Sequence, residues 1–188
     1  MGTNERNGVH SPINELTTKD IPWVSRDRMG SAPETDPRPY EVRTGAKVLC
    51  RHRGSVLLVQ ERHVDDTPFW TLPGGGVKEG ESPREALTRE VSEELQCGVI
   101  DGTRIGSMWY QHRSKPRTVT RYTVFEGTLT CSPTPNPEQG VHACRWVNDR
   151  SPPARTLQCV TALLRRHLDT DEAIAGNPAQ QVVPIEPT

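Results

Sequence analysis

Apolar residues gather in the central part of the chain, between two polar flanks. Residues 1–40 are rich in Pro, Ser, Asp, Arg and Gly and show no lasting apolar periodicity, which predicts a largely disordered arm or a strap over the domain. The last stretch is polar and contains three prolines. We therefore expect an N-terminal arm at 1–40, one folded domain at 41–169 and a flexible C-terminal tail at 170–188.

Within the central region, short apolar runs bounded by Gly, Pro and Ser turns predict strands, and two stretches with apolar residues every three or four positions predict helices. Strands grouped around two helices indicate an α+β or α/β sandwich, with a mixed β-sheet between the helices. The predicted strands are Ala46–Cys50, Val56–Gln60, Phe69–Leu72, Arg104–His112, Thr118–Leu129 and His142–Val147, and the predicted helices are Ser82–Leu95 and Ala154–Leu168.

The first helix has the clearest signals in the chain. Ser82 suits the N-cap, Pro83 suits the first helical position, and Glu85 lies where it completes a capping box. Three leucine or valine side chains spaced four residues apart predict its buried stripe. The helix follows a loop, Pro73–Gly76, whose glycines reach backbone angles closed to other residues.

The composition argues against some partners but does not by itself indicate a function. The 188 residues fit one domain, and the formal net charge of −1 gives no reason to expect nucleic acid or a membrane surface as a partner. No apolar run approaches the roughly 18 residues of a membrane helix, and the N-terminus has no secretory apolar segment. The five cysteines form no CxxC pair. We expect reduced thiols and a cytoplasmic protein.

The first helix also carries an acidic face. Glu90 and Glu94 are one turn apart and Glu93 flanks them, although like charges at that spacing repel each other. A hard cation would remove this penalty, because Mg²⁺ and Mn²⁺ prefer oxygen ligands. Arg89 is placed to orient Glu93 by a charge-assisted hydrogen bond. The alternative is a solvated acidic helix face, but the Gly-rich loop at a fixed distance before the helix favours a metal site for phosphate chemistry.

The run from Gly75 to Cys97 resembles the Nudix box, GX5EX7REUXEEXGU, where U is aliphatic. Seven of its nine specified positions match outright, and Cys97 is a borderline match for the last. Gln96 departs from the family, which expects Gly where the helix ends, so Gly98 is a second candidate for the helix terminator. The matching positions are Gly75, Glu81, Arg89, Glu90, Val91, Glu93 and Glu94.

This resemblance implies a pyrophosphohydrolase that uses Mg²⁺, or Mn²⁺, to cleave a nucleoside diphosphate derivative by water attack at phosphorus. Carried over by motif position, Glu90 and Glu94 are the main metal ligands, Glu93 is an accessory ligand or a base, and the carbonyl of Gly74 or Gly75 completes the shell. Arg89 orients a glutamate, and Glu81 is structural. Family members often place another glutamate outside the box, for which our candidate here is Glu138. An ordinary loop carboxylate is the alternative for Glu138. Glu126, which lies within a predicted strand, is a second candidate for this glutamate.

Substrate-binding signals are weaker than the box. Arg62 closes a strand where the family often has a phosphate-contacting arginine, with a surface salt bridge as the alternative. Arg113 and Arg121 belong to a basic segment that suits terminal phosphates, or equally a solvated loop and strand edge. Trp70, Trp109 and Tyr110 could stack on a base, whereas Trp146 is expected in the core beneath the last helix.

Two other functions remain open at this stage. A Nudix-fold regulator would bind nucleotides without hydrolysis, but such modules usually lose the box glutamates that this chain keeps. An RNA-end processing enzyme of the same family would need a basic surface stripe. Many family members dimerise, and residues 1–40 are the segment we expect to support a homodimer.

Overall fold

The computed structural model describes residues 41–111 and 117–175, with side chains of the last helix described as far as His167. No helix in the described part of the chain is long and apolar enough to cross a membrane. The elements in order are β1 (Glu41–His52), β2 (Ser55–Arg62), β3 (Pro68–Thr71), α1 (Pro83–Leu95), β4 (Val99–Gln111), β5 (Thr118–Leu129), the 3-10 turn η1 (Pro137–Gln139), β6 (Ala143–Asn148) and α2 (Gln158–Ala175).

The strands form one mixed sheet in the order β3-β2-β1-β5-β4, and β6 pairs with the other side of β2. Strands β1 and β5 are parallel along most of their length, and the remaining pairs are antiparallel. Parallel neighbours need a long crossover connection, which here includes β2, β3, α1 and β4. The mixed sheet confirms the predicted fold class.

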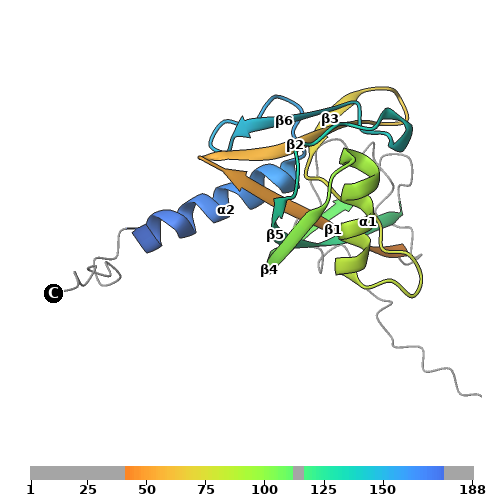
Figure 1. The fold of residues 1–188 in the computed structure, drawn as a ribbon, viewed down its shortest axis with the longest axis horizontal. Helices are drawn as coiled ribbons and strands as arrows, with labels where there is room; N and C mark the ends of the chain where they lie inside the picture. Colours follow the sequence, from red (N-terminus) through yellow and green to blue (C-terminus); the bar gives the residue numbers. More distant parts are fainter. Residues whose placement is uncertain (1–40, 112–116, 176–188) are drawn as a thin grey trace, which may run out of the picture.

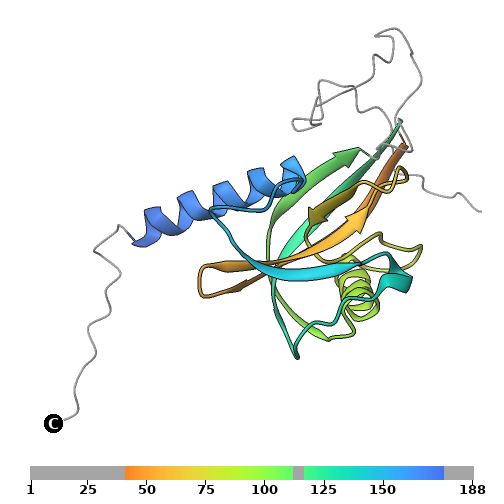
Figure 2. The same cartoon turned by 90° about the horizontal axis from the view of Figure 1, so that it is seen from above.

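The two helices pack on opposite faces of this sheet (Figures 1 and 2). Helix α1 buries Leu87, Val91 and Leu95 against one face, together with alternate residues of β1 and β2. The first turns of α2 bury Val160 and Leu163 against the other face. The predicted buried stripe of α1 is confirmed, because all three of its residues are fully buried.

Between β1 and β2 the sheet splits, and the split positions the Gly-rich loop. The two strands pair only at their hairpin end, next to the turn that joins them. Beyond that point, the loop after β3 takes the place of β2: Ala46 N–H donates to the Gly75 carbonyl at 2.9 Å, and Val48 N–H donates to the Pro73 carbonyl at 3.0 Å. The glycines therefore lie inside the sheet layer, beside the middle of β1.

Several boundaries differ from those predicted. Strand β5 matches exactly, but β1 begins earlier, because parallel pairing with β5 extends it to Glu41. Helix α2 begins at Gln158 and continues through Ala175, past the boundary that we placed at residue 169. Leu157, expected inside the helix, instead donates its N–H to the Trp70 carbonyl. The predicted arm at 1–40 lies outside the described residues.

Two side-chain predictions are wrong. Trp146 is 41% exposed and packs edge-on against His52, because alternation along β6 gives the inward position to Val147. Cys97 and Cys131 form a disulfide, with Cα atoms 5.8 Å apart. The prediction of reduced thiols is therefore wrong for these two cysteines. A backbone hydrogen bond from Thr130 to Gly98 brings the two segments together. Cys50, Cys144 and Cys159 are free.

Candidate active site

Helix α1 begins and ends with recognisable caps. Ser82 Oγ accepts a hydrogen bond from Glu85 N–H, and the Glu85 carboxylate accepts one from Ser82 N–H at 2.8 Å, which completes the predicted capping box. Gln96 ends the helix in the left-handed conformation, with φ 50°, and donates its N–H to the Ser92 carbonyl. The helix therefore stops at the position of the family's glycine, and Gly98 is not the terminator.

Two glutamates of this helix lie directly against the Gly-rich loop. Glu94 is buried, and its Oε2 accepts a hydrogen bond of 2.8 Å from Gly74 N–H. The Glu90 carboxylate sits so close to Gly75 that a Cβ at Gly75 would overlap it. Gly74 has φ 116°, and a Cβ there would collide with the Ala46 carbonyl. Glycine is thus required at 74 by the backbone and at 75 by the carboxylate.

Arg89 connects the acidic residues of the site. Its guanidinium donates two 2.8 Å hydrogen bonds to the Glu81 carboxylate, one of 2.7 Å to Glu90 and one of 3.3 Å to Glu93. It also donates to the Gly76 carbonyl at 3.0 Å. The predicted pairing of Arg89 with Glu93 is present, but Glu81 is its strongest partner. Arg89 thereby joins the loop before the helix to two carboxylates on the helix.

The electrostatics follow from this packing. Hydrogen bonds from Arg89, and then from Lys78 N–H, hold the pKa of Glu81 down at about 2. Burial raises the pKa of Glu94 to about 8, against the opposing influence of the Lys47 ammonium. Burial alone would lower the pKa of Lys47, but nearby carboxylates, Glu61 foremost and then Glu94, raise it above its usual value. Lys47 is therefore a buried, protonated amine beside the site.

The donor set matches a hard divalent cation in chemistry. Glu90, Glu93 and Glu94 supply carboxylate oxygens, and Gly75 supplies a carbonyl next to Glu90. Across the described residues, no three His, Cys, Asp or Glu side chains are grouped so as to hold a metal as they stand. Arg89 and Gly74 N–H each occupy carboxylate oxygens that a metal would use. The three glutamates fit a divalent cation by residue type and by their shared helix face. In this structure their carboxylates accept hydrogen bonds from Arg89 and Gly74 N–H.

Glu138 belongs to the short turn η1, which packs at the C-terminal end of the helix. It is exposed in η1, where its N–H is bound by the Asn136 side chain. Asn136 ties this turn to α1, donating its backbone N–H to the Glu94 carbonyl and its side-chain amide to the Glu93 carbonyl, both at 2.9 Å. Among the described residues, the Glu138 side chain forms no hydrogen bond or ion pair with Glu90, Glu93 or Glu94. Its role as a base stays a prediction.

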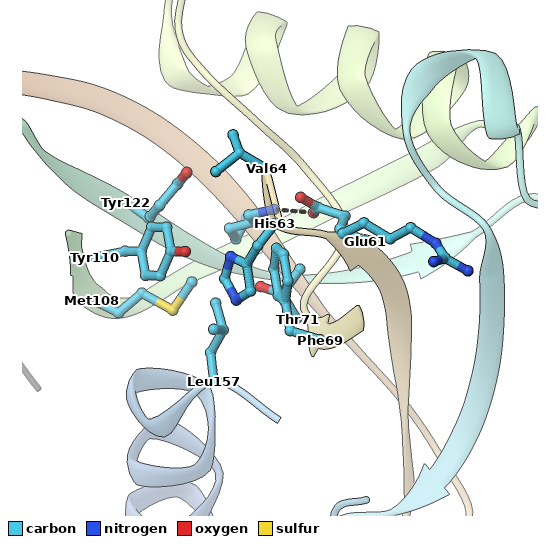
Figure 3. A pocket seen from close by; sticks show the side chains of 11 residues that line it. Glu61, His63, Val64, Phe69, Thr71, Met108, Tyr110, Tyr122 and Leu157 are labelled. Atoms are coloured by element: carbon cyan, nitrogen blue, oxygen red, sulfur yellow. Dashed lines mark ion pairs between the residues drawn. The ribbon is translucent and has the colours of Figure 1, made fainter. Parts of the chain in front are cut away.

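A pocket opens at the split between the two halves of the sheet (Figure 3). It includes about 600 Å³ of empty space, part of it open to solvent. His63 stacks on Phe69 with ring centroids 4.1 Å apart, and the two rings form one wall. Figure 3 shows Tyr110 and Met108 across from them and Leu157 beneath. The remaining lining residues are Lys47, Glu61, Arg62, Val64, Thr71 and Tyr122.

Our sequence reasoning missed the polar pair in this pocket. Lys47 Nζ lies 3.6 Å from Glu61 Oε1, and its side chain is 5% exposed. The signal was available, since Lys47 is the one charged residue in the apolar run Ala46–Cys50. A charged side chain is rarely buried without an ion-pair partner or a functional role. Its nearness to the site follows from the fold, because a Cβ at Gly74 would touch the Lys47 backbone.

The predicted substrate-binding residues are dispersed. Arg62 lines the pocket, but its guanidinium also forms a 2.8 Å ion pair with Asp66, the alternative we had considered. Trp70 belongs to the core beneath α2 and does not line the pocket, whose aromatic side chains are His63, Phe69, Tyr110 and Tyr122. Arg121 is exposed on β5 and lies over the Trp109 ring. Arg113 lies outside the described residues.

Comparison with known proteins agrees with the box and the fold. The family model described as NUDIX domain matches residues 39–153, well over half of the chain. The chain belongs to the Nudix family. Among solved structures, a MutT protein from Methanosarcina mazei Go1 has a TM-score of 0.62 at 19% identity, covering 71% of this chain and 97% of that one. At this identity, the likeness supports the fold alone.

Curated relatives of this Nudix chain match over part of its length. A putative 8-oxo-dGTP diphosphatase from Bacillus subtilis is 35% identical over 86 residues, which is 46% of this chain and 53% of the relative. An RNA pyrophosphohydrolase from Azorhizobium caulinodans is 29% identical over 133 residues, which is 60% of this chain and 77% of the relative. The chain thus spans only about half the length of the Bacillus relative.

Proposed function

We propose that this chain is a divalent-metal-dependent pyrophosphohydrolase that acts on a nucleoside diphosphate derivative. The observation that carries this proposal is the placement of Glu90 and Glu94 against Gly75 and Gly74. Family membership supports it, as do relatives named as diphosphatases and pyrophosphohydrolases. A regulator that only binds nucleotide would have no need for three box glutamates and the arginine that orients them.

In this mechanism, Glu90 and Glu94 would hold the cation, with Glu93 assisting and the Gly75 carbonyl completing the shell. The chemistry that a bound cation would supply is neutralisation of phosphate oxygens and a lower pKa for a water molecule. Arg89 keeps Glu90 and Glu93 turned toward the loop. Water adds to one phosphorus, the bridging P–O bond breaks, and the leaving phosphate takes the electron pair. Glu93 and Glu138 are the candidates to accept the proton of the attacking water.

The experiment is one substrate panel with the purified full-length protein. NTPs, dNTPs, ADP-ribose, nucleotide sugars, dinucleoside polyphosphates and 5′-triphosphorylated RNA are each incubated with Mg²⁺, with Mn²⁺ and with a chelator. The RNA is included because the Azorhizobium relative is named for that activity. We expect metal-dependent release of phosphate, pyrophosphate or a nucleoside monophosphate from at least one nucleotide. Tight nucleotide binding with no product from any substrate would favour the regulator instead.

A further inference from the structure

The pocket at the split in the sheet contains a polar pair, Lys47 and Glu61. Lys47 is a buried donor and Glu61, 30% exposed, is an acceptor, with 3.6 Å between Nζ and Oε1. Figure 3 marks this ion pair with a dashed line at the Glu61 carboxylate. Among the described residues, the Lys47 ammonium has no hydrogen bond within the usual distance. Its N–H groups are therefore available to a ligand in the pocket.

The charge balance argues against a phosphate in this pocket. Glu61 offsets the charge of Lys47, and the Arg62 guanidinium is already paired with Asp66 at 2.8 Å. A phosphate bound to Lys47 would lie against the Glu61 carboxylate and be repelled by it. A neutral group that accepts from Lys47 and donates to Glu61 meets no such penalty.

The pocket walls suit a flat, apolar body. The stacked His63–Phe69 pair forms one side, and Tyr110 and Met108 face it from β4. Aromatic rings and a thioether pack well against a planar ring system. A flat ring with a hydrogen-bonding edge is a nucleobase, and enzymes read such bases by that edge together with stacking.

We propose that the Lys47–Glu61 pair selects a guanine base by its Watson–Crick edge. Guanine presents the O6 acceptor beside two donors, N1–H and N2–H₂, so Lys47 can donate to O6 while both Glu61 oxygens accept. Adenine, cytosine and uracil offer a carboxylate only one donor group next to an acceptor, which leaves one Glu61 oxygen without a partner. An unpaired polar group in a site discriminates strongly between ligands.

The Lys47–Glu61 pair lies close to the loop that the acidic helix contacts. Lys47 follows Ala46, whose N–H binds the Gly75 carbonyl, and Gly74 packs against the Lys47 backbone. A base on Lys47 therefore lies one loop away from Glu90 and Glu94. This inference rests on the proposed function, since it assigns the nucleoside end of that substrate.

The test compares guanine and adenine ligands in the wild type and in Glu61→Gln. Glutamine keeps one acceptor but adds a donor that opposes guanine N–H groups and suits adenine. We expect GMP to bind the wild type at least about 10-fold more tightly than AMP without metal, a difference of about 1.4 kcal/mol. We expect Glu61→Gln to reduce this ratio by about 10-fold or more. The same change should appear in the kcat/KM ratio of dGTP to dATP with Mg²⁺.

Glu79→Gln is the matched control, because Glu79 is exposed and does not line the pocket. Glu61→Asp is a second variant, which keeps the charge but withdraws the acceptor and should also lower the preference for guanine. Equal binding of GMP and AMP, or an unchanged ratio in both Glu61 variants, would overturn the inference. Binding is measured without turnover, so guanine selection without hydrolysis would refute only the proposed function.

Discussion

At the scale of single residues, Arg89 is the centre of the site. It donates hydrogen bonds to three carboxylates, and Glu81 receives the two that share the planar guanidinium geometry. In this chain Glu81 precedes Arg89 by eight residues, and the loop before the helix returns to the arginine across that spacing. Sequence spacing located both residues, but their direct pairing appeared only in the structure.

The depressed pKa of Glu81 gives a pH prediction. Because this pKa falls from its usual 4.5 to about 2, the folded state binds fewer protons than the unfolded state between those values. The stabilising effect of Glu81 is therefore fully present above about pH 4.5 and is lost as the pH falls toward 2. The difference in free energy of unfolding between wild type and Glu81→Gln, followed by urea titration, should shrink as the pH is lowered from 4.5. A difference independent of pH would contradict the pairing.

A second prediction concerns the contact between Gly75 and Glu90. Alanine at 75 would place a Cβ where the Glu90 carboxylate lies, and that carboxylate is the movable end of a side chain. Gly75→Ala should therefore lower kcat/KM by about 10-fold or more through a displaced ligand, while changing the melting temperature little. Gly76→Ala is the control, because its Cβ would meet open space. Equal activity of the two variants would show that catalysis does not depend on the present position of the Glu90 carboxylate.

At the scale of elements, helix α1 is held in place at both ends. The capping box fixes its start, and Asn136 binds the carbonyls of Glu93 and Glu94 near its end. The first of these devices is local in sequence, so Ser82, Pro83 and Glu85 predicted it. The contact between Asn136 and the helix end joins residues more than forty positions apart, so no short sequence motif predicts it. The same holds for the disulfide between Cys97 and Cys131.

The cap gives a stability prediction for α1. Ser82→Ala removes the acceptor for Glu85 N–H and should lower the free energy of unfolding by about 1 kcal/mol. Ser92→Ala is a matched control, since Ser92 is exposed in the helix interior, where alanine is favourable. Chemical denaturation of both variants measures the difference. Equal stability of the two would mean that the capping box does not contribute to folding.

At the scale of the whole molecule, the sequence predicted the fold class and the position of the acidic helix, because both depend on local periodicity and on a long motif. It did not predict the parallel pairing of β1 with β5 or the split beside β2, which arise from contacts distant in sequence. The pocket was missed for the same reason. Lys47, Glu61 and Tyr110 belong to three strands, and only the assembled sheet brings them together.

Trp70 and Trp146 show that residue type alone does not predict whether a side chain is buried. Both are large aromatic residues near predicted strand ends, yet Trp70 is in the core and Trp146 faces solvent. Strand alternation decides the direction of each side chain, and a shift of one residue reverses it. Residue type alone does not give this direction, which is why Trp146 was wrongly expected in the core.

The central claim is metal-dependent hydrolysis by the face of α1 that carries Glu94. The most direct measurement is turnover of the best panel nucleotide by the wild type, by Glu94→Gln and by Glu79→Gln, with Mg²⁺ and with a chelator. Glutamine at 94 can still accept the hydrogen bond from Gly74 N–H, so the fold should remain and the melting temperature should change little. We predict turnover that requires the metal, falls by about 100-fold or more in Glu94→Gln and is unchanged in Glu79→Gln. Turnover that persists with chelator, or is unchanged in a folded Glu94→Gln protein, would contradict the account.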